Sequence, residues 1–276
     1  MNAKSRGLLI AGNWKMNNGL RETEAFFTTL KEKADSYLKN DHALFQQNSL
    51  RACLIPPYLS LQKATACAAH VSFPISIAAQ NAHWEKKGAF TGEISGEMLS
   101  EIGIRSVLVG HSERRQYFGE TDLTVQKRTE SLLSQGFQVI LCVGETRTQR
   151  DQGETEKILS QQLNGAIPNP GQGAATFLTG QLVIAYEPVW AIGTGVNATP
   201  AQAEEVHQFI RKFIWNRFGM ESAGRTPLLY GGSVTPENSD ALLSCPNIDG
   251  GLVGGASLKP ENFLALLQSA ARVLKN

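Results

Sequence analysis

The run Leu182-Val183-Ile184-Ala185-Tyr186 is apolar throughout, and the acidic residue Glu187 follows it directly. An uninterrupted apolar run of this length is typical of a parallel strand that is buried on both faces. Similar short runs recur at eight places along the chain. They are Leu8–Ala11, Ala52–Ile55, Ile75–Ala79, Val107–Val109, Val139–Val143, Leu182–Tyr186, Pro227–Tyr230 and Gly251–Val253. This recurrence predicts one parallel β-sheet.

Segments with helical spacing lie between and after these runs. Thr199-Pro200-Ala201-Gln202 combines an N-cap threonine, a proline at the first helical position and the glutamine of a capping box. Gly219 predicts the end of that helix. Thr235-Pro236-Glu237 and Lys259-Pro260-Glu261 open two further helices in the same way, and Gly136 ends a fourth. Eight strand–helix units favour the α/β class and a closed (β/α)8 barrel over an open doubly wound sheet.

The chain contains no linker rich in proline, glycine and serine, so we expect residues 1–276 to form a single domain. The nearest candidate for a linker is Asn164–Gly180, which lies between a predicted helix and a predicted strand. That position favours a surface loop over a domain boundary. Tyr37–Ser49 is predicted to be a second loop.

Composition excludes several classes of protein. The chain is 42% hydrophobic, and its 26 basic residues nearly balance its 25 acidic ones, for a net charge of +1. It is therefore not intrinsically disordered, and it lacks the basic excess of a nucleic-acid or membrane-surface binder. Its four cysteines, Cys53, Cys67, Cys142 and Cys245, are far apart, and the apolar run near the N-terminus is too short for a signal peptide. We expect reduced thiols in a cytoplasmic protein.

In a barrel of this kind, the catalytic groups come from the carboxyl ends of the strands and the loops after them. Lys15 and His111 follow the first and fourth apolar runs, and both are candidate electrophiles. Glu187 follows the sixth run and is a candidate base. Glycines after the sixth, seventh and eighth runs are candidates for binding an anion through their backbone N–H groups. These glycines are Gly193, Gly231, Gly232, Gly254 and Gly255.

One base, one polarising group and a phosphate site together indicate proton abstraction beside the carbonyl of a small phosphorylated sugar. Taken singly, each residue has a plainer interpretation as a structural histidine, a solvated carboxylate, a surface lysine or a turn glycine. Gly193 and Gly195 lack the third glycine of a dinucleotide fingerprint, and the other four histidines have no metal-ligand spacing. We expect neither a cofactor nor a metal.

The joint occurrence of the motifs favours the functional interpretation. Five segments occur in a fixed order: Asn13–Lys15, Gly110–Arg115, Ala185–Gly195, Tyr230–Val234 and Gly251–Ser257. Together they closely resemble the triosephosphate isomerase family, whose fold is the TIM barrel. The resemblance runs from about Leu8 to the final helix.

The resemblance implies an isomerase that interconverts dihydroxyacetone phosphate and D-glyceraldehyde 3-phosphate through an enediol(ate), in glycolysis and gluconeogenesis. Glu187 matches the family's base. His111 matches the neutral imidazole that polarises the carbonyl. Lys15 matches the cation near the enediolate and the phosphate, and Asn13 matches a neighbouring polar contact.

The resemblance also assigns the substrate contacts and a lid. Gly193, Ser233, Gly254 and Gly255 match backbone donors to the phosphate, beside Asn13 and Lys15. The lid is Pro188–Ala198, and its closure would raise the pKa of Glu187 by removing water from the carboxylate. A basic residue often follows the lid glycine at 195 in the family, whereas this chain has Val196-Asn197 there. That departure concerns lid closure and not the chemistry.

The same resemblance predicts a homodimer. Gln80-Asn81 and Gly88–Ser95 match the family's interface loop, at about residues 80–95, which reaches into a partner subunit near its Asn13 and Lys15. Thr91 is the expected contact across the subunits. Ser112 and Glu113 are expected to orient their neighbours, and Cys142 to be a packed strand residue.

Two other functions remain open from the sequence. One is an aldolase on the same barrel, with Lys15 as a nucleophile that forms a Schiff base. The other is a barrel that binds sugar phosphates without turnover.

Overall fold

The structure, a computed structural model, describes residues 6–168, 180–191 and 198–276. Eight parallel strands close into a barrel in chain order, and the last strand pairs with the first. The strands are β1 (Leu8–Asn13), β2 (Leu50–Ile55), β3 (Ile75–Ala79), β4 (Ser106–Val109), β5 (Gln138–Val143), β6 (Leu182–Tyr186), β7 (Leu228–Tyr230) and β8 (Gly250–Val253). The (β/α)8 prediction is confirmed, and each strand boundary lies within two residues of its predicted position.

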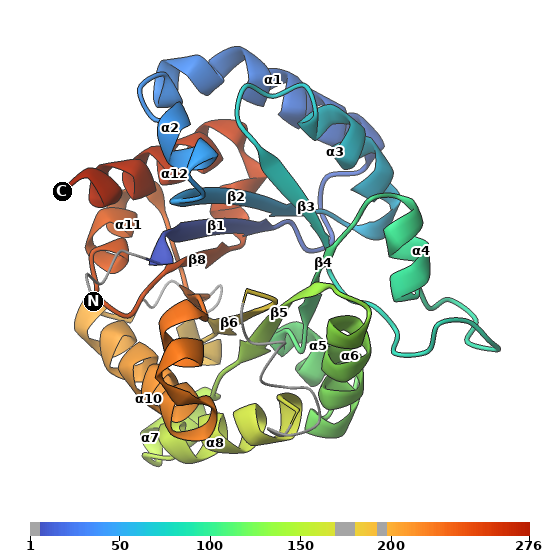
Figure 1. Ribbon diagram of the computed structural model, residues 1–276, viewed down its shortest axis with the longest axis vertical. Helices are drawn as coiled ribbons and strands as arrows, with labels where there is room; N and C mark the ends of the chain where they lie inside the picture. The colour runs from blue at the N-terminus through green and yellow to red at the C-terminus, as the bar shows by residue number, and fades with distance from the viewer. Residues whose placement is uncertain (1–5, 169–179, 192–197) are drawn as a thin grey trace.

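Helices surround this barrel on its outer side (Figure 1). They are α1 (Leu20–Leu38), α2 (His42–Gln46), α3 (Leu61–Ala68), α4 (Gly96–Glu101), α5 (Ser112–Tyr117), α6 (Asp122–Ser134), α7 (Arg147–Asp151), α8 (Thr155–Ala166), α10 (Pro200–Arg225), α11 (Pro236–Leu243) and α12 (Pro260–Lys275). The predicted capping box is present in α10, where Thr199 Oγ1 accepts the Gln202 N–H at 3.2 Å. The predicted starts of α11 and α12 are also confirmed.

The strands are apolar throughout because both of their faces are buried. In β5, Val139 and Leu141 face the layer of helices, whereas Ile140 and Cys142 face the barrel interior. The interior is filled by twelve side chains: Leu9, Ala11, Cys53, Ile55, Ala78, Leu108, Ile140, Cys142, Val183, Ala185, Leu229 and Leu252. The interior of the barrel is therefore a packed core and not a pore, so a ligand on the barrel axis must bind at one of its ends.

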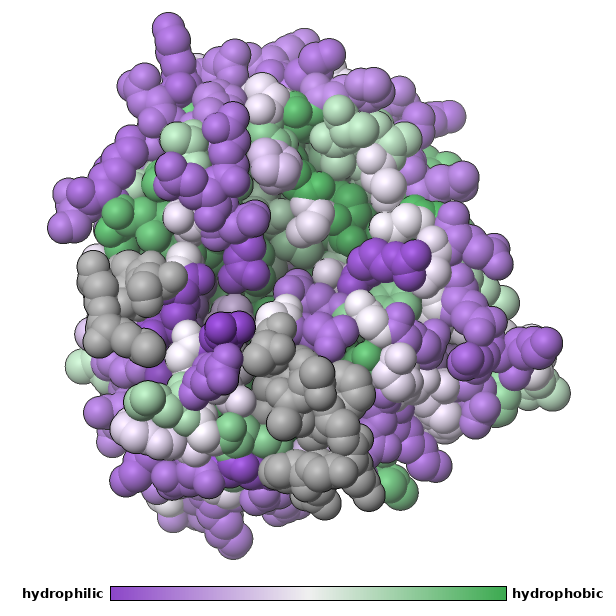
Figure 2. Space-filling model, viewed as in Figure 1, coloured by the Kyte–Doolittle hydropathy of each residue, from purple (hydrophilic) through white to green (hydrophobic). Residues whose placement is uncertain are grey.

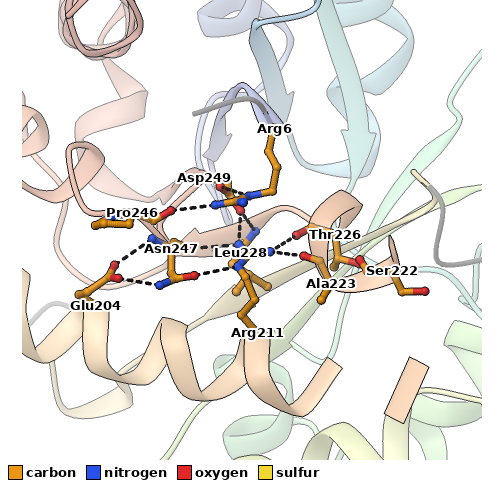
Figure 3. A network of polar contacts seen from close by, with 10 residues as sticks. All are labelled: Arg6, Glu204, Arg211, Ser222, Ala223, Thr226, Leu228, Pro246, Asn247 and Asp249. Carbon is orange, nitrogen blue, oxygen red and sulfur yellow. Dashed lines mark hydrogen bonds and ion pairs between the residues drawn. The ribbon is translucent and has the colours of Figure 1, made fainter. Parts of the chain in front are cut away.

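A network of polar contacts joins Arg6, which precedes β1, to α10 and to the segments where β7 and β8 begin (Figure 3). The main chain of Asp249 accepts from the Leu9 N–H and donates to the Leu228 carbonyl. Its buried carboxylate accepts hydrogen bonds from Arg6, Arg211 and the Leu228 N–H. The side chain of Asp249 thereby connects three parts of the molecule: the chain before β1, helix α10 and the first residue of β7.

The prediction of a loop at Tyr37–Ser49 is only partly right. Helix α1 continues to Leu38 and α2 spans His42–Gln46, with turns at residues 39–41 and 47–49. The reason is the burial of two apolar side chains, because Leu38 and Phe45 are 0% and 2% exposed. Phe45 packs on Phe73 with their ring centroids 4.9 Å apart. Burial of such a side chain is worth roughly 1.5–3 kcal/mol, enough to order a segment with a polar composition.

Two other predicted boundaries are only partly right. Gly219 has φ +87° and interrupts α10, but helical structure resumes and continues to Arg225 because Ala223 is buried there. The predicted loop Asn164–Gly180 begins inside α8, which ends at Ala166. The remainder of that loop, residues 169–179, lies outside the described residues.

The segment between β3 and α4 extends away from the body of the molecule (Figure 1). In the view of Figure 2, hydrophilic side chains dominate the rim, and hydrophobic ones show mostly in the recess among them. Within the described part of the chain, no helix has the length and apolar composition needed to cross a bilayer.

Candidate active site

The residues predicted from the strand ends come together at the carboxyl end of the barrel. Asn13 ends β1, His111 lies between β4 and α5, and Glu187 directly follows β6. They line a cavity of about 270 Å³. The predicted residues in its lining are Asn13, Lys15, His111, Glu187, Gly231, Gly232, Ser233, Gly254 and Gly255. Gly193, the other predicted phosphate contact, lies outside the described residues.

Glu187 and His111 are in direct contact. His111 Nε2 lies 2.9 Å from Glu187 Oε1, and the other carboxylate oxygen accepts the Ser112 N–H at 3.0 Å. The thiol of Cys142 also contacts this carboxylate from inside the barrel. Glu187 is 2% exposed and His111 is 5% exposed. Both oxygens of the candidate base are therefore occupied by partners from the protein.

A second hydrogen bond orients the ring of His111. Nδ1 accepts the N–H of Glu113 at 3.2 Å, in the first turn of α5. A nitrogen that accepts an N–H carries no proton of its own. In this arrangement Nε2 is the ring nitrogen that donates to Glu187.

The electrostatics of Glu187 differ from the expectation based on burial alone. Burial acts to raise the pKa of Glu187, but His111 and the Ser112 N–H stabilise the carboxylate more strongly, so its pKa is lowered. Burial likewise acts to lower the pKa of His111, but the adjacent Glu187 carboxylate acts more strongly in the other direction, so the pKa of His111 is raised. The expected rise in the pKa of Glu187 therefore requires the carboxylate to leave these partners.

Lys15 has an unusual backbone conformation. Its φ is +53°, in the left-handed region that side chains other than glycine seldom adopt. Its N–H donates to Asn13 Oδ1 at 3.0 Å, so Asn13 stabilises this conformation. Its Nζ lies 2.6 Å from Glu113 Oε1, and this ion pair holds the ammonium group at the cavity.

Two glycines allow the main chain around Glu187 to pack closely. A Cβ at Gly144 would collide with the Glu187 carbonyl. A Cβ at Gly231 would lie 2.9 Å from Glu187 Cγ, and one at Gly232 would collide with Tyr230 Oη. In contrast, nothing lies within 4 Å of a Cβ position at Gly255. The glycines after β7 therefore serve packing, and after β8 Gly255 leaves open space beside the cavity, while a Cβ at Gly254 would lie 3.7 Å from Lys15 Cε.

Glu145 anchors the first residues of the predicted lid. This fully buried side chain accepts hydrogen bonds at Oε1 from Tyr186 Oη and Trp190 Nε1, both at 3.0 Å. Arg150 lies 3.2 Å from the same oxygen. The lid begins with the 3₁₀ turn Val189–Ala191, and its residues 192–197, which include Val196-Asn197, lie outside the described residues.

Sequence reasoning missed the roles of Gly144 and Glu145. Both directly follow the fifth apolar run, which is the same signal that identified His111 and Glu187. The signal that could have found them is therefore their position at a strand end.

Among the described residues, no group of three or more His, Cys, Asp or Glu side chains could hold a metal ion.

Known proteins of one family are similar to this chain over nearly its whole length. The family model described as "Triosephosphate isomerase" matches residues 8–270. The triosephosphate isomerase of Thermus thermophilus is 46% identical over 268 residues, which cover 96% of this chain and 99% of that protein. Those of Acetivibrio thermocellus and Chlorobium chlorochromatii are 45% and 44% identical, over 94% and 96% of this chain and 96% and 99% of their own lengths. The chain belongs to the triosephosphate isomerase family.

Proposed function

We propose that Glu187, His111, Lys15 and Asn13 carry out the reaction of this family, the interconversion of dihydroxyacetone phosphate and D-glyceraldehyde 3-phosphate. The chain is an isomerase of glycolysis by its family membership. The observation that carries the assignment of residues is the single cavity lined by a carboxylate, an imidazole and an ammonium group. A reaction that moves one proton between neighbouring carbons needs these three groups and no cofactor.

In the proposed mechanism, Glu187 removes a proton from the carbon beside the substrate carbonyl and returns it to the neighbouring carbon. The Nε2–H of His111 donates to the carbonyl oxygen, where negative charge develops, and proton exchange at the two oxygens completes the interconversion. Lys15 stabilises the same charge. Donors of this kind are worth about 2.7–4 kcal/mol each to a developing oxyanion. Substrate and product have the same composition, so no other reactant is needed.

This mechanism requires Glu187 to move away from His111. Both groups are occupied by each other in the described arrangement, at 2.9 Å. Once the carboxylate leaves His111 and Ser112, burial alone acts on it and raises its pKa, which makes it a stronger base. Residues 188–198 form the proposed lid. Its closure would move the carboxylate of Glu187 and would also exclude water from the cavity.

We propose that Ser233, Gly254, Gly255 and Gly193 bind the substrate phosphate through their backbone N–H groups. The first three line the cavity, and the ammonium group of Lys15 lies beside them. Backbone donors suit a phosphate because several of them can converge on one anion without a side chain between.

We also propose that residues 1–276 form one domain and that the protein is a cytoplasmic homodimer. Three large apolar side chains are open to solvent, with Met16 95%, Leu59 86% and Phe90 43% exposed. Met16 directly follows Lys15, and Phe90 lies in the loop at residues 80–95. Exposed apolar side chains at these places support an interface with a second copy. The loop at residues 80–95 would place Thr91 near Asn13 and Lys15 of that copy. Sedimentation of a fully active monomer would contradict this proposal.

The alternative of a Schiff-base aldolase is disfavoured by the environment of Lys15. The nucleophile must be free to attack as an amine, whereas Lys15 Nζ is held in an ion pair with Glu113 Oε1 at 2.6 Å. Borohydride added with dihydroxyacetone phosphate should give no covalent label. The main proposal is tested by a coupled assay in which a second enzyme consumes the dihydroxyacetone phosphate formed from glyceraldehyde 3-phosphate. The same assay tests the alternative that the protein binds sugar phosphates without turnover. Absence of isomerisation by the folded protein would overturn the proposed function.

A further inference from the structure

The strained backbone of Lys15 has a second support, from a residue outside the proposed catalytic set. Gln80 directly follows β3, and its Nε2 donates to the Lys15 carbonyl at 2.6 Å. The same amide nitrogen donates to the Ile55 carbonyl, at the end of β2, at 3.1 Å. Gln80 therefore reaches from β3 past β2 to the residue that carries the ammonium group.

The two sides of the Lys15 residue are held by different side chains. Asn13 accepts the N–H at 3.0 Å, and Gln80 donates to the carbonyl. Only three described residues other than glycine have a positive φ, and the other two, Asn18 and Asn48, are of a type that tolerates it better. A lysine persists in this conformation only when its surroundings determine it.

The backbone conformation of Lys15 decides where its side chain points. A residue that returned to negative φ would direct its Cα–Cβ bond elsewhere, and Nζ would leave Glu113 and the cavity. We propose that Gln80 is a positioning residue that holds the ammonium group of Lys15 in the active site by fixing the Lys15 carbonyl. This inference rests on the proposed function, because it assumes that Lys15 contacts the phosphorylated substrate.

The test compares two glutamines that each donate to a main-chain carbonyl. Gln80→Leu removes the donor with little change in size. Gln268→Leu is the matched control, because Gln268 donates to the Tyr37 carbonyl at 3.0 Å between α12 and α1. Gln80→Leu should lower kcat/KM by about 10–100-fold, the usual consequence of moving a catalytic group by an ångström or less. Gln268→Leu should change only thermal stability.

A second measurement does not require turnover. Inorganic phosphate should bind the wild-type cavity, and calorimetry should show weaker binding by Gln80→Leu but unchanged binding by Gln268→Leu. Loss of phosphate affinity in Gln80→Leu at normal secondary structure supports the positioning role. A folded Gln80→Leu variant with wild-type phosphate affinity and wild-type kcat/KM overturns it. An inactive wild type that still binds phosphate more tightly than Gln80→Leu would overturn the proposed function alone.

Gln80→Glu gives an independent readout if the leucine variant does not fold. A carboxylate at this position can only accept, so it repels the Lys15 and Ile55 carbonyls, whereas the protonated acid can donate its O–H to one of them. The activity of the variant relative to wild type should therefore rise as the pH falls. His111, Glu113, Lys15 and Glu187 are present in both proteins, so wild type measured over the same pH range is the reference for this ratio. A ratio that does not change with pH, in protein that circular dichroism shows to be folded, contradicts the proposal.

Discussion

The two ends of the barrel each contain a buried carboxylate, but they use it differently. Asp249 is 1% exposed and Glu187 is 2% exposed, so burial does not distinguish them. The partners of Asp249 come from three separate segments, and its main chain also joins β7, β8 and β1 (Figure 3). Those of Glu187 include the neighbouring residues His111 and Ser112, beside an open cavity.

The difference shows what makes a buried charge structural or functional. Around Asp249, a change of partner would separate parts of the chain that are far apart in sequence. Around Glu187, a ligand in the cavity can replace His111 without separating any strands. We therefore expect substitutions at Asp249 to affect stability and substitutions at Glu187 to affect turnover.

The largest effect is expected from Glu187→Gln. The amide cannot accept a proton from carbon, so kcat should fall by about 10²–10⁴-fold, the usual contribution of a general base. The Ser112 N–H can still donate to the amide oxygen, and urea unfolding should therefore show little loss of stability. A variant that retains wild-type kcat would remove Glu187 from the role of base.

Asp249→Asn should show the opposite behaviour. It leaves the guanidinium groups of Arg6 and Arg211 without their anion, and breaking a buried ion pair costs about 3–5 kcal/mol. The loss should appear in urea unfolding, with kcat per folded molecule unchanged. Asp151→Asn, which breaks an exposed pair with Arg147, is the control and should cost less than about 1 kcal/mol. Equal losses in the two variants would contradict the structural role of Asp249.

A third variant sharpens the comparison because it should affect both stability and activity. Gly144→Ala would force the main chain of Glu187 to shift, since the new Cβ collides with the Glu187 carbonyl. Overpacking of this kind typically costs about 1–3 kcal/mol. We expect kcat to fall by about 10-fold, because the base is displaced while it keeps its chemistry. The measurements are urea unfolding and the coupled assay, and an active variant of normal stability would refute the close approach.

The strands and the members of the site could be predicted because each depends on local sequence. A strand buried on both faces must be apolar, and the residue that follows it must lie at the carboxyl end of the barrel. This reasoning located Glu187 and His111 without knowledge of any distance. It did not locate α2, because the burial of Phe45 against Phe73 depends on a contact between distant parts of the chain.

The backbone conformation of Lys15 and the pKa of Glu187 could not be predicted from the sequence, because both depend on contacts between distant parts of the chain. Nothing in the residues around Lys15 indicates a positive φ, since the hydrogen bond that supports its carbonyl comes from Gln80, which follows β3 and is distant in sequence. The lowered pKa of Glu187 was also not predicted, because its direction depends on whether burial or the contact with His111 is stronger. Which effect is stronger depends on the distances between Glu187 and its partners, and these distances cannot be obtained from the sequence.

The smallest expected effect concerns the pH dependence of stability. The pKa of Glu187 is lower in the folded protein than in the unfolded chain, so protons bind the unfolded state more readily. Its contribution to stability is therefore present above the unfolded pKa of about 4.3 and is lost as the pH falls through the lower, folded value. Glu187→Gln lacks this contribution. The difference in unfolding free energy between wild type and variant is measured in urea from pH 5 to pH 3, below the ordinary pKa of histidine, because Glu187 also raises the pKa of His111. Over this range it should become less favourable to wild type on acidification. A difference that instead grew in favour of wild type would mean that burial, and not His111, determines the pKa of Glu187 in the resting site.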